Sequence, residues 1–254
     1  MDQRIIELKH RARKLTAARP QSAFAQDCAE ELGHANALFF EHPLMQRLQD
    51  DALPYLNEQS AIGVEHSKRV AIEAAALALA EPSGLDGEER RRVAVLAEMA
   101  GLLHDSSRFE EDHAAQGAEL TLRLLANYPL SDEERTHIAQ AVALHETALP
   151  LADEGPEAAR LLAAVVHDAD CFRFGPEILP TTLWELCDME EWTLERIARV
   201  FPEGPRRAAT LRDAFRTEQG RRYGPELLDE GARMAPEYTR IIEQLLAETD
   251  PANT

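Results

Sequence analysis

Residues 95–109 read VLAEMAGLLHDSSRF, and this stretch decides how the rest of the sequence is interpreted. Its first nine residues, Val95 to Leu103, are almost all apolar and predict a helix. Asp86 is a suitable N-cap for that helix, because acidic residues follow it in the first turn. The helix ends directly on the pair His104-Asp105. Two ionisable side chains at the end of an apolar helix need partners inside the protein.

The same kind of pattern extends through the whole chain. Apolar residues recur every three or four positions, Pro and Gly mark the joints, and no stretch alternates convincingly like a β-strand. A capping box at Ser131 marks the start of one helix. The sequence therefore predicts an all-α, multi-helix bundle. Its helices are expected over residues 3–19, 22–40, 44–53, 60–80, 86–104, 113–128, 131–146 and 157–170, with three or four more up to about residue 247.

The predicted organisation is a helical core between two helical flanks. Residues 1–59 form an N-terminal helical extension, residues 60–187 form the core, and residues 188–254 form C-terminal helices that pack on the core. The length of 254 residues suits one large domain or two small ones.

The composition is that of an ordinary globular protein, but the charge is strongly negative. Hydrophobic residues make up 44% and charged residues 29%, and 27 Lys and Arg face 46 Asp and Glu, for a net charge of −19. Such a chain repels phosphate backbones and anionic membranes, so we expect no nucleic-acid scaffold and no membrane surface as partners. The amino terminus lacks the apolar stretch of a signal peptide, which predicts a soluble, cytoplasmic protein. The sequence leaves the oligomeric state open.

Several ionisable residues share one kind of position, on the apolar face or at the end of a predicted helix. A buried His or Asp is costly without a partner, whereas one divalent cation satisfies several of them. For any single residue, a hydrogen-bonded core side chain is the ordinary explanation. The convergence of several helices on one polar cluster favours a metal ion instead. The residues are His66, His104, Asp105, His145 and Asp170.

Their order resembles that of the HD-domain superfamily of metal-dependent phosphohydrolases, in which a His, a His-Asp pair and a distal Asp follow one another. Two departures accompany the resemblance. Ser106-Ser107 stands where the family has Ile-Gly, and no Gly-Tyr-Pro follows His145-Glu146, as it would in the cyclic-dinucleotide branch. The matching segments are EHSKRVA at 65–71, LLHDSSRF at 102–109, HAAQGAEL at 113–120, AVALHE at 141–146 and HDAD at 167–170.

The resemblance implies a metal site with a hydrolytic activity. One or two divalent transition-metal ions (Fe, Mn, Co or Ni, with Mg²⁺ as a further option) would activate a water that attacks phosphorus. The substrate would be a small phosphomonoester, phosphodiester or nucleotide. Asp105 would bridge the ions. Arg108, three residues beyond Asp105, could contact a phosphate oxygen, and of Lys68 and Arg69, which follow His66, one could face the same cleft. The implied metal ligands are His66, His104, Asp105, His113, His145 and Asp170, of which all but His113 and His145 suffice for one ion.

Alternatives remain open at this point. The same ligand set resembles a few HD-type proteins that hold two irons and use dioxygen to cleave carbon bonds. A non-catalytic regulatory or binding protein could also keep the metal as a structural element. The chain has a second His-Asp pair, His167-Asp168, which is followed two residues later by Asp170. We expect that pair to support the metal ligands from behind or to lie on the surface.

Overall fold

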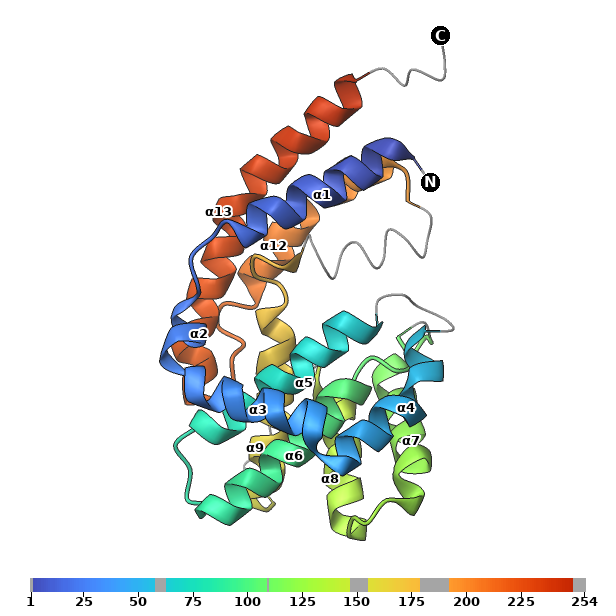
Figure 1. Ribbon diagram of the computed structural model, residues 1–254, viewed down its shortest axis with the longest axis vertical. Coiled ribbons are helices and arrows are strands. Elements are labelled where there is room, and N and C mark those ends of the chain that lie inside the picture. The colour runs from blue at the N-terminus through green and yellow to red at the C-terminus, as the bar shows by residue number, and fades with distance from the viewer. Residues whose placement is uncertain (1, 58–62, 109, 147–154, 179–191, 249–254) are drawn as a thin grey trace.

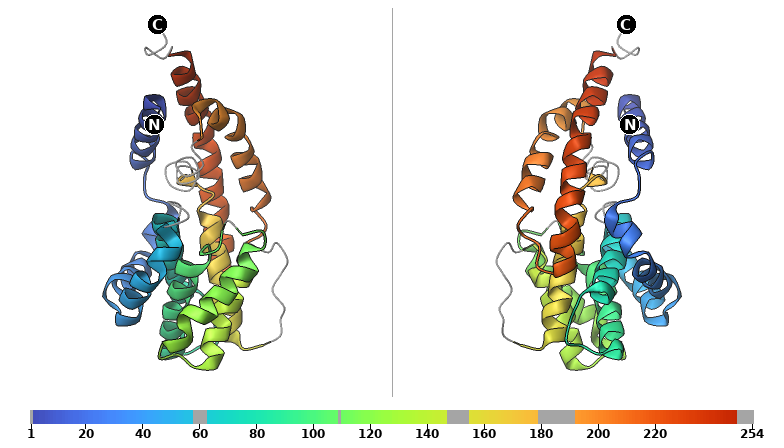
Figure 2. Two further views of the ribbon diagram at one scale, coloured as in Figure 1. Left: turned by 90° about the vertical axis from the view of Figure 1, so that its right-hand side faces the viewer. Right: turned by 90° about the vertical axis from the view of Figure 1, so that its left-hand side faces the viewer.

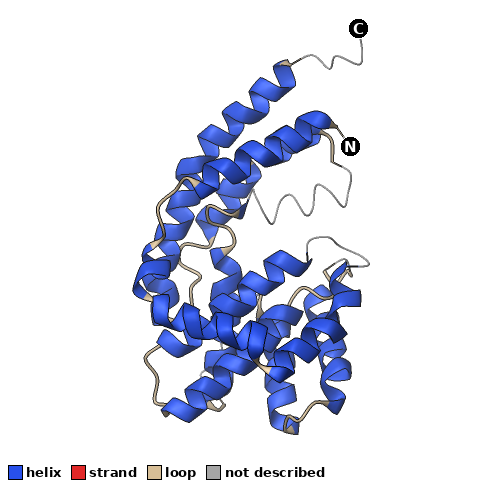
Figure 3. Ribbon diagram, viewed as in Figure 1, coloured by secondary structure: helices blue, strands red, loops and turns tan. Residues whose placement is uncertain are grey.

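The computed structural model describes residues 2–57, 63–108, 110–146, 155–178 and 192–248. All regular structure in these ranges is helical and none of it is a strand (Figure 3), so the all-α prediction is confirmed. No helix in these ranges is both long and apolar enough to cross a membrane. The elements are α1 (Gln3–Ala17), α2 (Ala23–Asp27), α3 (Ala29–Glu41), α4 (Pro43–Asn57), α5 (Gly63–Ala80), α6 (Gly87–Leu103), α7 (His113–Leu124), η1 (Leu125–Asn127), α8 (Asp132–Leu144), α9 (Glu157–Phe172), α11 (Leu194–Val200), α12 (Glu203–Thr210) and α13 (Glu218–Ala247).

The helix starts follow the capping signals in the sequence. Asp86 and Ser131 each form a capping box, with Glu89 and Glu134 respectively, at the start of α6 and α8. Most predicted helices differ from the observed ones by a few residues at their ends, and two differ in another way. The helix expected over 22–40 is interrupted at Cys28, whose backbone leaves the helical region and separates α2 from α3. The helix expected to stop before Pro54 continues through it to Asn57.

The main hydrophobic core lies where α5, α6, α8 and α9 pack together, in the lower body of Figure 1. Helices α2, α3 and α4 cover this body from one side and contribute Phe24, Phe39 and Met45 to the core. Every residue of α6 from Val93 to Leu103 is buried. That helix therefore runs through the middle of the bundle and delivers His104 and Asp105 into its interior.

Gly101 allows α5 and α6 to approach closely. A Cβ atom built at Gly101 would lie 2.7 Å from the Ala71 Cα and 2.8 Å from its nitrogen, so only glycine fits against this backbone. The contact holds the first turn of α5, which carries His66, beside the end of α6, which carries His104. The glycine is thus a precondition for the two histidines to meet.

We expect Gly101→Ala to lower the free energy of unfolding by about 1–3 kcal/mol, because the added methyl group overpacks a backbone contact. Gly33→Ala is the matched control: Gly33 lies inside α3 and a Cβ there meets nothing within 4 Å. The control should be more stable than the wild type by about 0.5–1 kcal/mol, through helix propensity alone. Urea unfolding measures both. Equal stability of Gly101→Ala and the wild type would contradict the close approach.

A second, smaller core lies outside the main body. The amino-terminal helix α1 packs along the carboxyl-terminal half of α13, and α11 closes the cluster with Leu194 and Ile197. Figures 1 and 2 show this arm extending from the body, with α1 beside the upper part of α13. The helices of residues 1–57 therefore divide between two places. Helix α1 joins the carboxyl-terminal helices, and α2, α3 and α4 join the main core.

The second His-Asp pair anchors α13 to the body. Asp168 is fully buried, accepts a hydrogen bond from the Thr217 hydroxyl at 2.7 Å, and accepts two more from the backbone nitrogens of Arg216 and Thr217. His167 completes the group with Nδ1 2.9 Å from Asp168 Oδ1. A surface position for this pair was a wrong expectation, because carboxylate oxygens can satisfy the buried donors at the start of α13. Glu81 binds the next two backbone nitrogens, Glu218 and Gln219.

Candidate metal centre

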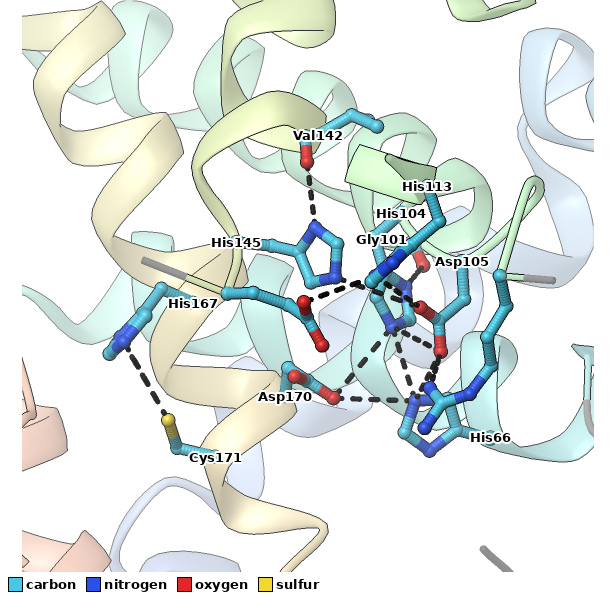
Figure 4. A network of polar contacts seen from close by, with 12 residues as sticks. His66, Gly101, His104, Asp105, His113, Val142, His145, His167, Asp170 and Cys171 are labelled. Atoms are coloured by element: carbon cyan, nitrogen blue, oxygen red, sulfur yellow. Dashed lines mark hydrogen bonds and ion pairs between the residues drawn. The ribbon is translucent and has the colours of Figure 1, made fainter. Parts of the chain in front are cut away.

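The structure brings all six predicted metal ligands together. They come from the ends of five helices: the first turn of α5, the end of α6, the start of α7, the end of α8 and the last turn of α9. Figure 4 shows their side chains pointing toward one another, while His167 points away toward Cys171. The residues are His66, His104, Asp105, His113, His145 and Asp170. Three overlapping groups among them place their ligand atoms within 4.8 Å of one another.

One half of the cluster forms around His66 and His104. The two Nε2 atoms lie 3.1 Å apart. Asp170 Oδ1 lies 3.3 Å from His66 Nε2 and 3.7 Å from His104 Nε2. Asp105 Oδ2 lies 3.6 Å and 3.5 Å from the same two nitrogens. Two imidazole nitrogens and two carboxylate oxygens thus face a common point.

The other half forms around His113 and His145. Asp105 Oδ1 lies 3.6 Å from His145 Nε2 and 4.0 Å from His113 Nε2. Asp105 therefore divides its two oxygens: Oδ2 faces the half with His66 and His104, and Oδ1 faces the half with His113 and His145. This is the arrangement by which a single carboxylate can bridge two cations.

Backbone carbonyl groups fix two of the imidazole rings. His104 Nδ1 donates to the Gly101 carbonyl at 2.7 Å, and His145 Nδ1 donates to the Val142 carbonyl at 2.7 Å. A carbonyl oxygen can only accept, so Nδ1 carries the proton in both rings. In the neutral rings the lone pair is then on Nε2, which points into the cluster. This is the usual way in which proteins orient a histidine for a metal.

The cluster is buried and holds ionised carboxylates. Burial raises the pKa of a carboxyl group, but the neighbouring His104 outweighs it and holds the pKa of Asp105 well below its usual range. Asp170 has a lowered pKa as well, because its contact with His66 outweighs burial. Burial lowers the pKa of His66, whereas at His104 the Asp105 carboxylate outweighs burial and raises the pKa to about 9. The negative potential that favours a proton on His104 also favours a metal cation.

The donor set fits a divalent transition metal. Asp105 Oδ1 is buried and has no hydrogen-bond partner among the described residues, and the buried His113 Nε2 faces it at 4.0 Å. A buried carboxylate oxygen without a partner is costly, and a cation bound between the two atoms would satisfy it. Imidazole nitrogens together with carboxylate oxygens suit Fe, Mn, Co, Ni and Zn. These buried His and Asp groups could therefore hold a metal ion.

Arg108 lies at the edge of the centre. Its Nη1 donates to Asp105 Oδ2, the oxygen that also faces His66 and His104. The guanidinium side chain is 27% exposed, so it reaches from the buried carboxylate toward solvent. The structure thus places Arg108 beside the metal-ligand candidates, and its contact with a phosphate oxygen stays a prediction.

Lys68 is not at the centre. Its Nζ lies 3.4 Å from Glu65 Oε2 and 5.4 Å from the centroid of the Phe40 ring. Residues two apart on an α-helix point in nearly opposite directions, so Lys68 cannot face the same side of α5 as His66. The structure therefore does not bring Lys68 together with the six metal-ligand candidates, and its contact with a phosphate stays a prediction.

Glu146 is a neighbour of the centre that the sequence analysis did not single out. Its Oε2 lies 3.2 Å from His113 Nε2, and the side chain is half exposed. It directly follows His145 at the end of α8, so the adjacent acid was the available signal. The carbonyl groups of Gly101 and Val142 carry no signal in the sequence, since any residue supplies one.

Comparisons of this chain with family models, with curated proteins and with solved structures found no match.

Proposed function

We propose that this protein is a metal-dependent phosphohydrolase that acts on a small phosphate ester or nucleotide. The observation that carries the proposal is the divided Asp105 carboxylate, with two histidines on the side of each oxygen. A bridge of this kind is what a two-metal hydrolytic site requires. The resemblance of the five sequence segments to HD-domain phosphohydrolases supports the same assignment.

The residues would divide the work as follows. His66, His104 and Asp170 would hold one ion, His113 and His145 would hold the other, and Asp105 would serve both. A divalent ion bound there would lower the pKa of a water ligand and stabilise charge on the phosphate oxygens. The Gly101 and Val142 carbonyls keep His104 and His145 in the required orientation. Glu146 contacts the same Nε2 atom of His113 that faces Asp105, so a metal ion bound by that nitrogen would replace this contact.

Arg108 is the residue that we assign to phosphate binding. In this structure its guanidinium compensates the Asp105 carboxylate. A metal cation would take over that compensation, and the guanidinium would then bind a phosphate oxygen at the same edge of the centre. Charge-assisted hydrogen bonds from arginine to phosphate are among the strongest in proteins.

A di-iron oxygenase is the second candidate, because four histidines and two aspartates around one bridging carboxylate would serve that chemistry equally well. Iron present in two oxidation states, together with dioxygen consumption, would favour it. The two functions differ in what they consume, so the same purified protein can be tested for both.

The test is phosphate release from a panel of phosphomonoesters, cyclic phosphodiesters and nucleotides, after loading with Mn²⁺, Fe²⁺ or Co²⁺. The wild type should hydrolyse at least one class. Arg108→Gln should retain its metal but lose about 10–100-fold in kcat/KM, the cost of one charge-assisted hydrogen bond. The exposed Arg123→Gln is the matched control and should behave as the wild type. Fully loaded protein that hydrolyses no ester would contradict the proposal.

A further inference from the structure

A groove separate from the metal centre is lined by several arginine side chains. It consists of a cavity of about 320 Å³ and an adjoining open hollow of about 640 Å³, which share Arg19, Glu65, Arg69 and Glu177. It lies between the end of α1, α2 and α3 on one side and α5 with the end of α9 on the other. None of the six metal-ligand candidates lines it. We call it the arginine groove.

The arginine groove has more cationic than anionic side chains, whereas the chain as a whole is acidic. Acidic residues outnumber basic ones by 46 to 27 overall. In the groove the cationic side chains are the more numerous: Arg13, Arg19, Lys68, Arg69 and Arg173 face Glu65, Glu73 and Glu177. Glu230 reaches Arg19 from α13 at 3.0 Å and adds one more carboxylate.

Three of these arginines converge on a single carboxylate. Glu177 oxygens lie 3.6 Å from Arg19, 3.0 Å from Arg69 and 3.1 Å from Arg173. Each guanidinium has five N–H donors, so one shared carboxylate uses only part of what the three can offer. Burial raises the pKa of Glu73 to about 7 against the effect of Arg173, so this carboxyl compensates the cations incompletely at neutral pH.

One residue that lines the cavity has a donor with no hydrogen-bond partner among the described residues. Arg173 is 5% exposed and lines the cavity, and its Nε is buried without a hydrogen-bond partner. Its two terminal nitrogens bind Glu73 and Glu177. Buried polar groups normally have partners. Apolar walls from Phe24, Leu32 and Ile72 complete the cavity, whose size is near the lower end for small-molecule sites.

From this convergence we propose that the arginine groove is a second binding site, for a small organic polyanion of the pyrophosphate class. The forked guanidinium groups of Arg19, Arg69 and Arg173 would bind its oxygens in pairs, as arginine does with phosphate and carboxylate groups. The apolar walls would contact its organic part. The site uses no residue of the metal centre and does not depend on the function proposed for that centre.

The test is calorimetric titration of inorganic pyrophosphate into chelator-treated full-length protein at 150 mM salt, where exposed charges are screened. The wild type should bind one pyrophosphate per chain. Arg19→Gln and Arg69→Gln should each bind at least about tenfold more weakly, because each loses charge-assisted hydrogen bonds. Arg240→Gln is the matched control: it changes an exposed arginine with a glutamate partner on α13, outside the groove, and should leave the affinity unchanged.

Asp105→Ala separates this proposal from the metal centre. It alters the centre and leaves the arginine groove intact, so its pyrophosphate affinity should equal that of the wild type. Three results would each overturn the proposal. The wild type could fail to bind pyrophosphate, Arg19→Gln and Arg69→Gln could both bind it as tightly as the wild type, or Asp105→Ala could lose the binding. Citrate in a parallel titration tells a polycarboxylate from a polyphosphate as the preferred polyanion.

Discussion

Asp105→Ala is expected to lose metal from both halves of the centre and to abolish hydrolysis. Its two oxygens face different pairs of histidines, at 3.5 and 3.6 Å on one side and 3.6 and 4.0 Å on the other. Removing a group that merely supports a metal ligand costs 10–100-fold in affinity, so removing a ligand shared by two ions should cost more than about 100-fold for each. Competition with a chromophoric chelator measures both affinities.

Variants of the two halves make the expectation specific. His66→Ala should weaken one ion and largely spare the other, and His145→Ala should do the reverse, because Asp105 presents a different oxygen to each. Asp112→Ala is the control, since this exposed residue precedes His113 and its side chain forms no capping hydrogen bond. If Asp105→Ala weakened only one ion, the carboxylate would not be a bridge.

Glu98→Gln is expected to change how stability depends on pH by several kcal/mol. Glu98 lies in the middle of α6, is fully buried, and has no hydrogen-bond partner for either oxygen among the described residues. Burial raises its pKa to about 9 from an ordinary value of 4.5. Between these values the folded protein keeps a proton that the unfolded chain loses, so rising pH favours unfolding. Each unit of pH contributes up to about 1.4 kcal/mol.

The measurement is urea unfolding of the wild type and Glu98→Gln at pH 5.5 and pH 8. The other groups titrate in both proteins, so the difference between them reports on Glu98. From pH 5.5 to pH 8 the free energy of unfolding of Glu98→Gln should rise by about 2–4 kcal/mol relative to that of the wild type. Glu119→Gln on the exposed face of α7 is the control and should gain nothing. Parallel pH dependence of Glu98→Gln and the wild type would contradict the buried, protonated state.

The helical bundle and five of the six clustered residues were accessible from helix patterns in the sequence, whereas His113 followed only from the resemblance to HD-domain proteins. Apolar spacing located the helices, and His66, His104 and Asp170 stood out at their ends. The same spacing would have excluded Lys68, which is two residues from His66 and so on the other side of α5.

Other features depend on contacts between distant segments, which helix patterns do not report. Nothing local in α1 indicates that it leaves residues 23–57 and packs on α13. The approach at Gly101 depends on the backbone of Ala71, and the arginine groove forms from α1, α5 and the segment after α9. Glu98 looked like an ordinary charged residue within an apolar run, and only the packing of the bundle shows that α6 is buried on all sides.

The most direct test of the two-metal account is the metal content per chain of wild-type protein purified without chelator and then incubated with Mn²⁺, Fe²⁺ or Co²⁺. Elemental analysis should find about two ions per chain, one for each oxygen of Asp105. A single ion would contradict the bridging role of Asp105 and leave His113 and His145 outside the metal site. No bound ion under any of these conditions would contradict the metal centre itself.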